Sequence, residues 1–264
     1  MDFVKKDCYT IDDLRQIMRI LRSENGCPWD REQTHASIRK NLIEETYEAV
    51  EAIDNQDAEG LREELGDVLL QVVFHAQMEE EQGGFSFDDV VHEICAKLIV
   101  RHPHIFGDVT VSGVEDVLDN WNQIKQETKG QTTASETLQS VPRQLPALMR
   151  SEKVQGRAKK ANPVFGYSDA QAAFSDLQSE TEELSAAIRS GEEGTVAEEI
   201  GDVLFAAVNV ARMYDLDPEE LLTRSCDKFV ERFERVESLA MEQNVSMRDA
   251  SAALLDELWK KVKE

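Results

Sequence analysis

The sequence predicts an all-α protein built from two tandem helical modules. Its 264 residues include only 13 Gly and 6 Pro, a composition that favours helices over turn-rich β structure. Apolar residues recur at helical spacing, and one helical segment occurs twice. A chain of this length accommodates two domains of ordinary size.

The repeated segment is the clearest sign of duplication. Residues 63–78 read EELGDVLLQVVFHAQM and residues 198–213 read EEIGDVLFAAVNVARM, and the two align without a gap with nine identities in sixteen positions. The polar stretch between the copies is rich in Thr, Ser and Gln, as a linker is. We therefore predict a first module at residues 1–130, a linker at 131–145 and a second module at 146–264.

Each module should contain a pair of helices. Residues 42–53 have a helical pattern, and a short turn separates them from the helix of the repeated segment, so the two helices should run antiparallel. The apolar stripes of the repeated segments should form the core. They comprise Leu65, Val68, Leu69, Val72 and Val73 in the first copy and Ile200, Val203, Leu204, Ala207 and Val208 in the second.

Carboxylates recur in both copies at a fixed spacing. Glu-x-x-Glu on the first helix and Glu-x-x-Asp on the second place each pair on one helix face, because residues three apart are neighbours there. Four like charges that meet across two helices repel one another, and a bound cation relieves the repulsion. The predicted ligands are Glu45, Glu48, Glu64 and Asp67 in the first module and Glu180, Glu183, Glu199 and Asp202 in the second.

Carboxylate oxygens select hard cations, which favours Mg²⁺, with Mn²⁺ as an alternative. A glycine precedes the aspartate in both copies, at Gly66 and Gly201, which indicates either close helix approach or room for a ligand. Basic and aromatic residues follow and suit phosphate oxygens and a nucleobase. They are Lys97, Arg101 and Trp121 in the first module and Lys228, Arg232 and Trp259 in the second.

The composition excludes several other classes. A formal net charge of −24 opposes binding to nucleic acid or to an anionic membrane. The four cysteines form no CxxC pair and read as free thiols, and the sequence contains no stretch suited to a signal peptide or a membrane span. We expect a cytoplasmic protein.

Two other interpretations compete with the metal-site prediction. Glu-x-x-His at Glu32 and His35, and nearly again at Asp89 and His92, matches part of a di-iron bundle pattern, but neither recurs in the second copy. Acidic helices also suit a non-catalytic scaffold that only dimerises or senses nucleotides. Acidic and basic groups retained in both copies favour an enzyme.

The motifs Gly26-Cys27-Pro28-Trp29-Asp30, Glu44-Glu45-Thr46-Tyr47-Glu48, Glu64-Leu65-Gly66-Asp67 and Arg101-His102-Pro103-His104 resemble those of the MazG family of nucleoside triphosphate pyrophosphohydrolases. The resemblance implies tandem all-α modules with a four-helix-bundle-like core, a homodimer, and Mg²⁺-dependent hydrolysis between the α- and β-phosphates. It assigns catalytic roles to Glu44, Glu180 and Glu183. Ser179 stands where Glu44 opens the first motif, so the sequence leaves open which module is active, as it does the preferred base and sugar.

Overall fold

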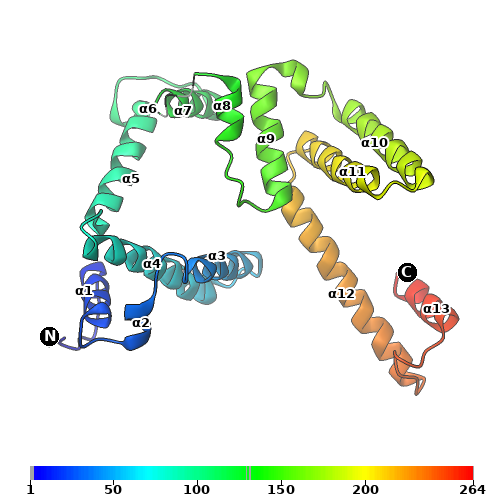
Figure 1. Cartoon of the computed structure of the whole chain (residues 1–264), viewed down its shortest axis with the longest axis horizontal. Helices are drawn as coiled ribbons and strands as arrows, with labels where there is room; N and C mark the ends of the chain where they lie inside the picture. Colours follow the sequence, from blue (N-terminus) through cyan, green and yellow to red (C-terminus); the bar gives the residue numbers. More distant parts are fainter. Residues whose placement is uncertain (1–2, 129, 131, 264) are drawn as a thin grey trace. The chain divides into compact units, whose positions relative to one another are not determined.

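The computed structural model describes residues 3–128, 130 and 132–263, and these residues form helices without any β-strand. They divide into two compact units, Met1–Lys125 and Gln126–Glu264 (Figure 1). The all-α prediction and the duplication are thus confirmed. The first unit contains α1 (Ile11–Arg22), α2 (Pro28–Glu32), α3 (Arg39–Asp54), α4 (Ala58–Glu81), α5 (Phe87–Arg101) and α6 (Pro103–Phe106), and α7 (Val114–Thr128) reaches its end.

The second unit begins with a short helix and ends with a long helix and a short one. It contains α8 (Ala134–Gln139), α9 (Ala147–Ala161), a 3₁₀ turn (Pro163–Phe165), α10 (Ala170–Ser190), α11 (Glu193–Met213), α12 (Pro218–Glu242) and α13 (Ala252–Lys263). Figure 1 shows the same motif in both units, a pair of neighbouring helices: α3 with α4, and α10 with α11.

Local sequence signals set the ends of these pairs. Asp57 caps α4 by accepting hydrogen bonds from the backbone amides of Glu59 and Gly60, and Asp169 caps α10 through the amide of Ala172. Gly191 ends α10 with a φ of 77°, the left-handed conformation that glycine adopts readily. Only short turns join the paired helices, so each pair is antiparallel as predicted.

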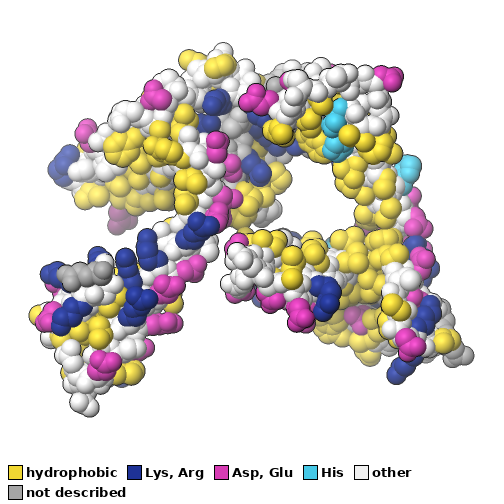
Figure 2. Space-filling model, turned by 180° about the vertical axis from the view of Figure 1, so that it is seen from behind, with side chains coloured by type: hydrophobic (Ala, Val, Ile, Leu, Met, Phe, Trp, Pro, Cys, Tyr) yellow, Lys and Arg dark blue, Asp and Glu magenta, His cyan; other side chains and the backbone are white. Residues whose placement is uncertain are grey.

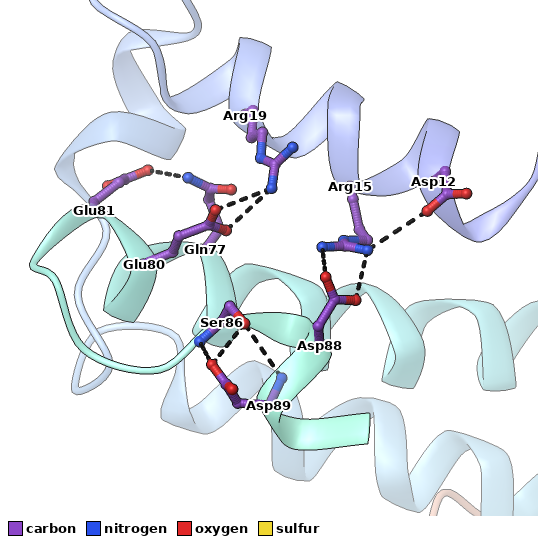
Figure 3. A network of polar contacts seen from close by, with 9 residues as sticks. All are labelled: Asp12, Arg15, Arg19, Gln77, Glu80, Glu81, Ser86, Asp88 and Asp89. Carbon is purple, nitrogen blue, oxygen red and sulfur yellow. Dashed lines mark hydrogen bonds and ion pairs between the residues drawn. The ribbon is translucent and has the colours of Figure 1, made fainter. Parts of the chain in front are cut away.

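Charged pairs fix α1 and α5 around α4 in the first unit. Arg15 donates two hydrogen bonds of 2.8 Å to the carboxylate of Asp88, and Arg19 contacts Glu80 at 3.0 Å (Figure 3). Beneath them lies the core of Met18, Ile38, Val73, Phe74 and Met78. The pairs thus hold α1 over the second half of α4, away from the half that carries Glu64 and Asp67.

The predicted core stripe is only partly buried. Val73 and Val208 are 2% exposed, but Leu65 and Ile200 are 54% and 47% exposed. Leu69 and Leu204 are exposed too, whereas the prediction placed all of them in the core. Two helices cover only one side of each other, so a second apolar stripe stays uncovered in the single chain; Figure 2 shows such hydrophobic side chains on the surface.

The stretch predicted as a linker contains a short helix. Thr133 and Glu136 form a capping box that begins α8 within it, and Val141 is buried. Arg157 of α9 donates to the Ser140 hydroxyl at 2.6 Å and to the carbonyl of Thr137. Capping and these contacts with α9 explain why the stretch is polar. Composition alone does not distinguish such a stretch from an exposed loop.

Candidate functional site

Three carboxylates meet at the helix pair of the first unit. Glu45 and Glu48 come from α3 and Glu64 from α4, and one oxygen of each lies within 4.8 Å of the others. Asp67, the fourth predicted ligand, is outside this trio but close enough to raise the pKa of both Glu45 and Glu64. Three of the four predicted ligands therefore come together by distance, and Asp67 lies near them.

The second unit repeats the cluster with a different membership. Glu180 of α10 meets Glu199 and Asp202 of α11, again with ligand oxygens within 4.8 Å of one another. Here Glu183 is the carboxylate outside the trio. It accepts a hydrogen bond of 3.4 Å from the hydroxyl of Ser179, the residue that replaces the first glutamate of the motif.

In both clusters, neighbouring carboxylates repel one another, and a bound cation would reduce this repulsion. Burial is the main cause that raises the pKa of Glu45, Glu64, Glu180 and Glu199, and neighbouring carboxylates raise each pKa further. Converging oxygen donors that repel one another fit a hard divalent ion. The residues present therefore suit the metal that the sequence resemblance implies.

The glycines beside Asp67 and Asp202 do not mark close helix contacts. A Cβ atom placed on Gly66 or on Gly201 would meet no other atom within 4 Å. Of the two explanations offered for these glycines, close helix approach is wrong for the single chain. Open space beside the carboxylates remains, and it leaves room for a ligand next to each cluster.

The first glutamate of the motif has a different partner from its neighbours. Glu44 forms an ion pair of 2.7 Å with Lys40, one turn earlier on α3. This pair lies on the exposed side of the helix, with the Lys40 side chain 82% and the Glu44 side chain 47% exposed. Glu44 is thus next to the cluster in sequence, raises the pKa of Glu45, and stays accessible to water.

The predicted phosphate ligands of the first unit do not reach the carboxylates within one chain. Lys97 is exposed on α5 and forms no hydrogen bond or ion pair with any described residue. Arg101 instead places its guanidinium 5.1 Å from the ring centre of Trp121, and the ring of His102 contacts the same indole edge-on at 5.0 Å. These contacts explain Arg101, His102 and Trp121 as one cluster at the end of α5.

The second unit's basic residues are arranged similarly on α12. Lys228 and Arg232 make no hydrogen bond or ion pair among the residues that the structure describes. Trp259 packs its ring 5.2 Å from that of Phe229 and lies 5.9 Å from the Lys263 ammonium. One face of this aromatic cluster belongs to the packing of α13 on α12.

One group beside the second cluster was not singled out from the sequence. Tyr167 donates a hydrogen bond of 2.5 Å to Asp176, which lies one turn before Glu180 and raises its pKa. Burial and this contact raise the pKa of Tyr167 to about 12. The sequence does offer a signal for Asp176, because it shares a helix face with Glu180. A search for residues repeated in both modules misses Asp176, because the first module has Asn41 at this position.

The residues of the alternative di-iron pattern do not come together as one set. Asp89 caps α5 with Ser86, whereas His35 lies against His75 and Glu79 of α4. His102 begins the break at Pro103 that ends α5, as predicted. Within the described residues, no helix is long and apolar enough to cross a membrane.

Comparisons with known proteins agree with the two-unit site. The family model described as the MazG nucleotide pyrophosphohydrolase domain matches residues 33–106 and again 169–237, together more than half of the chain and including every carboxylate of both clusters. The nucleoside triphosphate pyrophosphohydrolase of Escherichia coli K12 is 41% identical over 96% of this chain and 97% of its own length.

Two further relatives differ in how much of their own length this chain covers. A nucleoside triphosphate pyrophosphohydrolase/pyrophosphatase of Thermotoga maritima is 40% identical over 96% of this chain and 95% of its own. The Bacillus subtilis protein YabN is 46% identical over 95% of this chain, which spans only 51% of that protein's length. With two matched domains and these relatives, the chain belongs to the MazG nucleotide pyrophosphohydrolase family.

Proposed function

We propose that this protein hydrolyses nucleoside triphosphates to nucleoside monophosphates and pyrophosphate. The observation that carries the proposal is the pair of carboxylate trios, one in each unit, within domains of a pyrophosphohydrolase family. The names of the Escherichia coli and Thermotoga maritima relatives support the same reaction. Removal of unwanted nucleotides from the cellular pool is the role that this reaction suggests.

Mg²⁺ is the proposed cofactor, with Mn²⁺ as an alternative, because oxygen-only donor sets favour both. When bound, the ion neutralises triphosphate charge and favours in-line attack by water on the α-phosphorus. The residues that would hold it are the two trios and the carboxylates next to them, Glu45, Glu48, Glu64 and Asp67 in one unit and Glu180, Glu183, Glu199 and Asp202 in the other.

A carboxylate is needed to orient the attacking water or accept its proton. In the first unit we assign this role to Glu44, which is exposed beside the cluster. Ser179 cannot accept a proton in the same way, so in the second unit the role falls to Glu180 or Glu183. Lys97, Arg101 and Trp121, and likewise Lys228, Arg232 and Trp259, would bind phosphate oxygens and base.

A homodimer would complete this arrangement. Ile43 and Tyr47 on α3, with Leu65 and Leu69 on α4, are 40–54% exposed on the helices that carry the first cluster. An apolar surface on such a central helix pair favours burial against a second copy. The second copy could also bring basic residues of α5 or α12 to carboxylates that they do not contact in the single chain.

A non-catalytic scaffold that dimerises or senses nucleotides is the alternative. It would need the apolar stripes of the helix pairs but not the carboxylates that converge beside them. The division into modules at 1–130 and 146–264 allows a separate test: a fragment that ends near residue 130 should hydrolyse nucleotides by itself if the first module is an enzyme.

The decisive experiment is chromatographic analysis of products from several NTPs and dNTPs, with Mg²⁺, with Mn²⁺ and with a chelator. Metal-dependent formation of NMP and pyrophosphate is expected, and comparison of the bases and sugars defines the substrate range, including dUTP and non-canonical nucleotides. NDP and phosphate as products, or no turnover with any substrate, would favour the scaffold. Light scattering of the same sample measures whether two copies associate.

A further inference from the structure

A pair of histidines in the first unit lies outside the carboxylate cluster. His35 belongs to the segment between α2 and α3, His75 lies on α4, and their Nδ1 atoms are 2.7 Å apart. The ring centres are 5.0 Å apart and the ring planes differ by 5°. Centres that far apart, with nitrogens this close, require the two Nδ1 atoms to lie between the centres, so the rings meet edge to edge rather than face to face.

This geometry is that of a linear N–H···N hydrogen bond, in which one imidazole donates and the other accepts. A metal ion does not fit between the rings, since each metal–nitrogen bond alone takes about 2 Å. A single shared proton does fit. A proton on both facing nitrogens would bring two N–H groups into collision, so at least one of these Nδ1 atoms must remain unprotonated while the rings stay in contact.

The surroundings limit where further protons can go. His35 Nε2 lies 2.9 Å from Glu79 Oε1, a distance that suits an ion pair, although the ring is not aligned for a linear hydrogen bond. His75 Nε2 is buried and has no hydrogen-bond partner among the described residues. The second ring nitrogen of His35 therefore has an acidic neighbour, whereas that of His75 has none among the described residues.

Several charged residues on the surrounding helices pair with one another, and Glu79 is the acidic residue that contacts the histidine pair. On α1, Arg19 and Arg22 pair with Glu80 and Glu81; on α5, Asp88 pairs with Arg15; on α3, Lys40 pairs with Glu44. Burial, and then the neighbouring His35, lower the pKa of His75. The contact between the rings agrees with this, because it needs a neutral partner.

We propose that His35 and His75 form a shared-proton clamp that ties the start of α3 to α4, and that acidification opens it in the first unit alone. His35 lies four residues before α3, which carries Glu45 and Glu48, and α4 carries Glu64. The clamp thus joins the two chain segments whose spacing sets the first carboxylate cluster. The clamp is a feature of the fold and does not depend on whether the cluster is catalytic.

The second unit provides an internal comparison. The offset of 135 that superposes the repeated segments places Ala170 and Val210 at the positions of His35 and His75. Neither side chain takes up a proton. The same helix pair is therefore present twice in one chain, once with the histidine contact and once without it.

The sign of the pH effect follows from the lowered pKa of His75. The unfolded chain takes up a proton near the ordinary value of 6.5, and the folded chain does so only at lower pH. Stability from the neutral pair is complete above 6.5 and is lost as the pH falls below it.

The hydrogen bond itself can be detected by NMR of the full-length protein with ¹⁵N-labelled histidine, since the chain contains only five histidines. A through-bond coupling between the two Nδ1 nuclei is expected at about pH 8 and should vanish by about pH 5. Single substitutions assign the two rings. No coupling at high pH would overturn the clamp, and coupling that persists in acid would overturn its opening.

Hydrogen exchange tests the effect on α3. The amides of residues 33–44 should lose protection on acidification relative to the matched residues 168–179 of the second unit, after correction for intrinsic exchange. His75→Gln should abolish this pH-dependent difference, and His92→Gln, on the exposed face of α5, should preserve it. Equal pH dependence in the two segments of the wild-type protein, or an unchanged difference in His75→Gln, would overturn the proposal.

Discussion

The two units carry the same four carboxylates, but a different three of them come together in each unit, and the surroundings differ. In the first, Glu44 pairs with Lys40 and the residue one turn before Glu45 is the neutral Asn41. In the second, Ser179 replaces Glu44, and the equivalent of Asn41 is Asp176, held by Tyr167. The duplication has kept the groups that converge on the cluster and has changed the groups beside it.

This difference bears on which unit performs the proposed reaction. The first unit retains an exposed carboxylate that could act on water, whereas the second has an additional acid, Asp176, next to its cluster. More negative charge favours cation binding and opposes binding of a bare triphosphate. We therefore expect the second unit to bind divalent metal more tightly and, because the proposed reaction depends on that metal, to contribute most of the turnover.

Loss of one carboxylate in each unit should have the largest effect. Asp202→Asn is expected to lower kcat/KM by roughly 100-fold or more, because it removes a cation ligand with little change in shape. The matched variant Asp67→Asn should lower it less. Steady-state kinetics with circular dichroism as the control for folding makes the comparison. The reverse order would make the first unit the principal catalyst, and full activity in both variants would exclude these aspartates from the site.

Metal binding should stabilise the protein to a degree that depends on pH. The raised pKa values of Glu45, Glu64, Glu180 and Glu199 mean that the folded metal-free state binds protons more tightly than the unfolded state. Their contribution to stability therefore declines as the pH rises above the ordinary value of 4.5, through the interval up to the raised values. The same rise in pH frees the oxygens for Mg²⁺.

Thermal denaturation with and without Mg²⁺ measures this linkage. A stabilisation of about 2.7 kcal/mol is expected at a metal concentration 100 times Kd, near neutral pH, and less at about pH 5. Asp202→Asn should reduce the shift more than Asp67→Asn does. A shift that is independent of pH, or equal in both variants and the wild type, would contradict binding at these clusters.

Much of the helix pair could be predicted from the sequence because its signals are local. Carboxylates three residues apart, capping residues such as Asp57, and the duplicated segment need no knowledge of the rest of the chain. The exposure of Leu65 and Ile200 could not be predicted in this way. Periodicity identifies an apolar face, but which face is covered depends on partners that are distant in sequence or on another chain.

The sequence predicts which carboxylates of the candidate site come together, but not where its basic and aromatic residues lie. Glu45 and Glu64 converge because two adjacent helices carry them, a relation fixed by one short turn. The position of Lys97 depends on how far α5 departs from α4, and that of Trp121 on α7, so spacing along the chain does not determine either. The contact between His35 and His75 is likewise invisible in the sequence, since forty residues separate them.

Substitution of the two matched glycines should have a smaller effect. It separates a change in stability from a change in the space available to a ligand. Gly66→Ala and Gly201→Ala should each stabilise the metal-free protein by about 1 kcal/mol, because alanine favours helix and its Cβ meets no atom within 4 Å. Denaturant unfolding measures the gain. If the open space receives substrate, Gly201→Ala should also raise KM more than Gly66→Ala. Destabilisation by either change would mean that another surface packs against these glycines.

The smallest expected effect concerns Ser179. Its hydroxyl lies 3.4 Å from Glu183 in a weak and exposed hydrogen bond, so Ser179→Ala should change the free energy of unfolding by less than about 0.5 kcal/mol. Glu183 would then be free to join the trio of Glu180, Glu199 and Asp202, which adds an oxygen donor. We expect Mg²⁺ activation of the variant at a metal concentration equal to or lower than that of the wild type. A requirement for more Mg²⁺ would show that the Ser179 hydroxyl contributes to metal binding at the second cluster. The replacement of glutamate by serine would then have exchanged one ligand for another rather than removed a ligand.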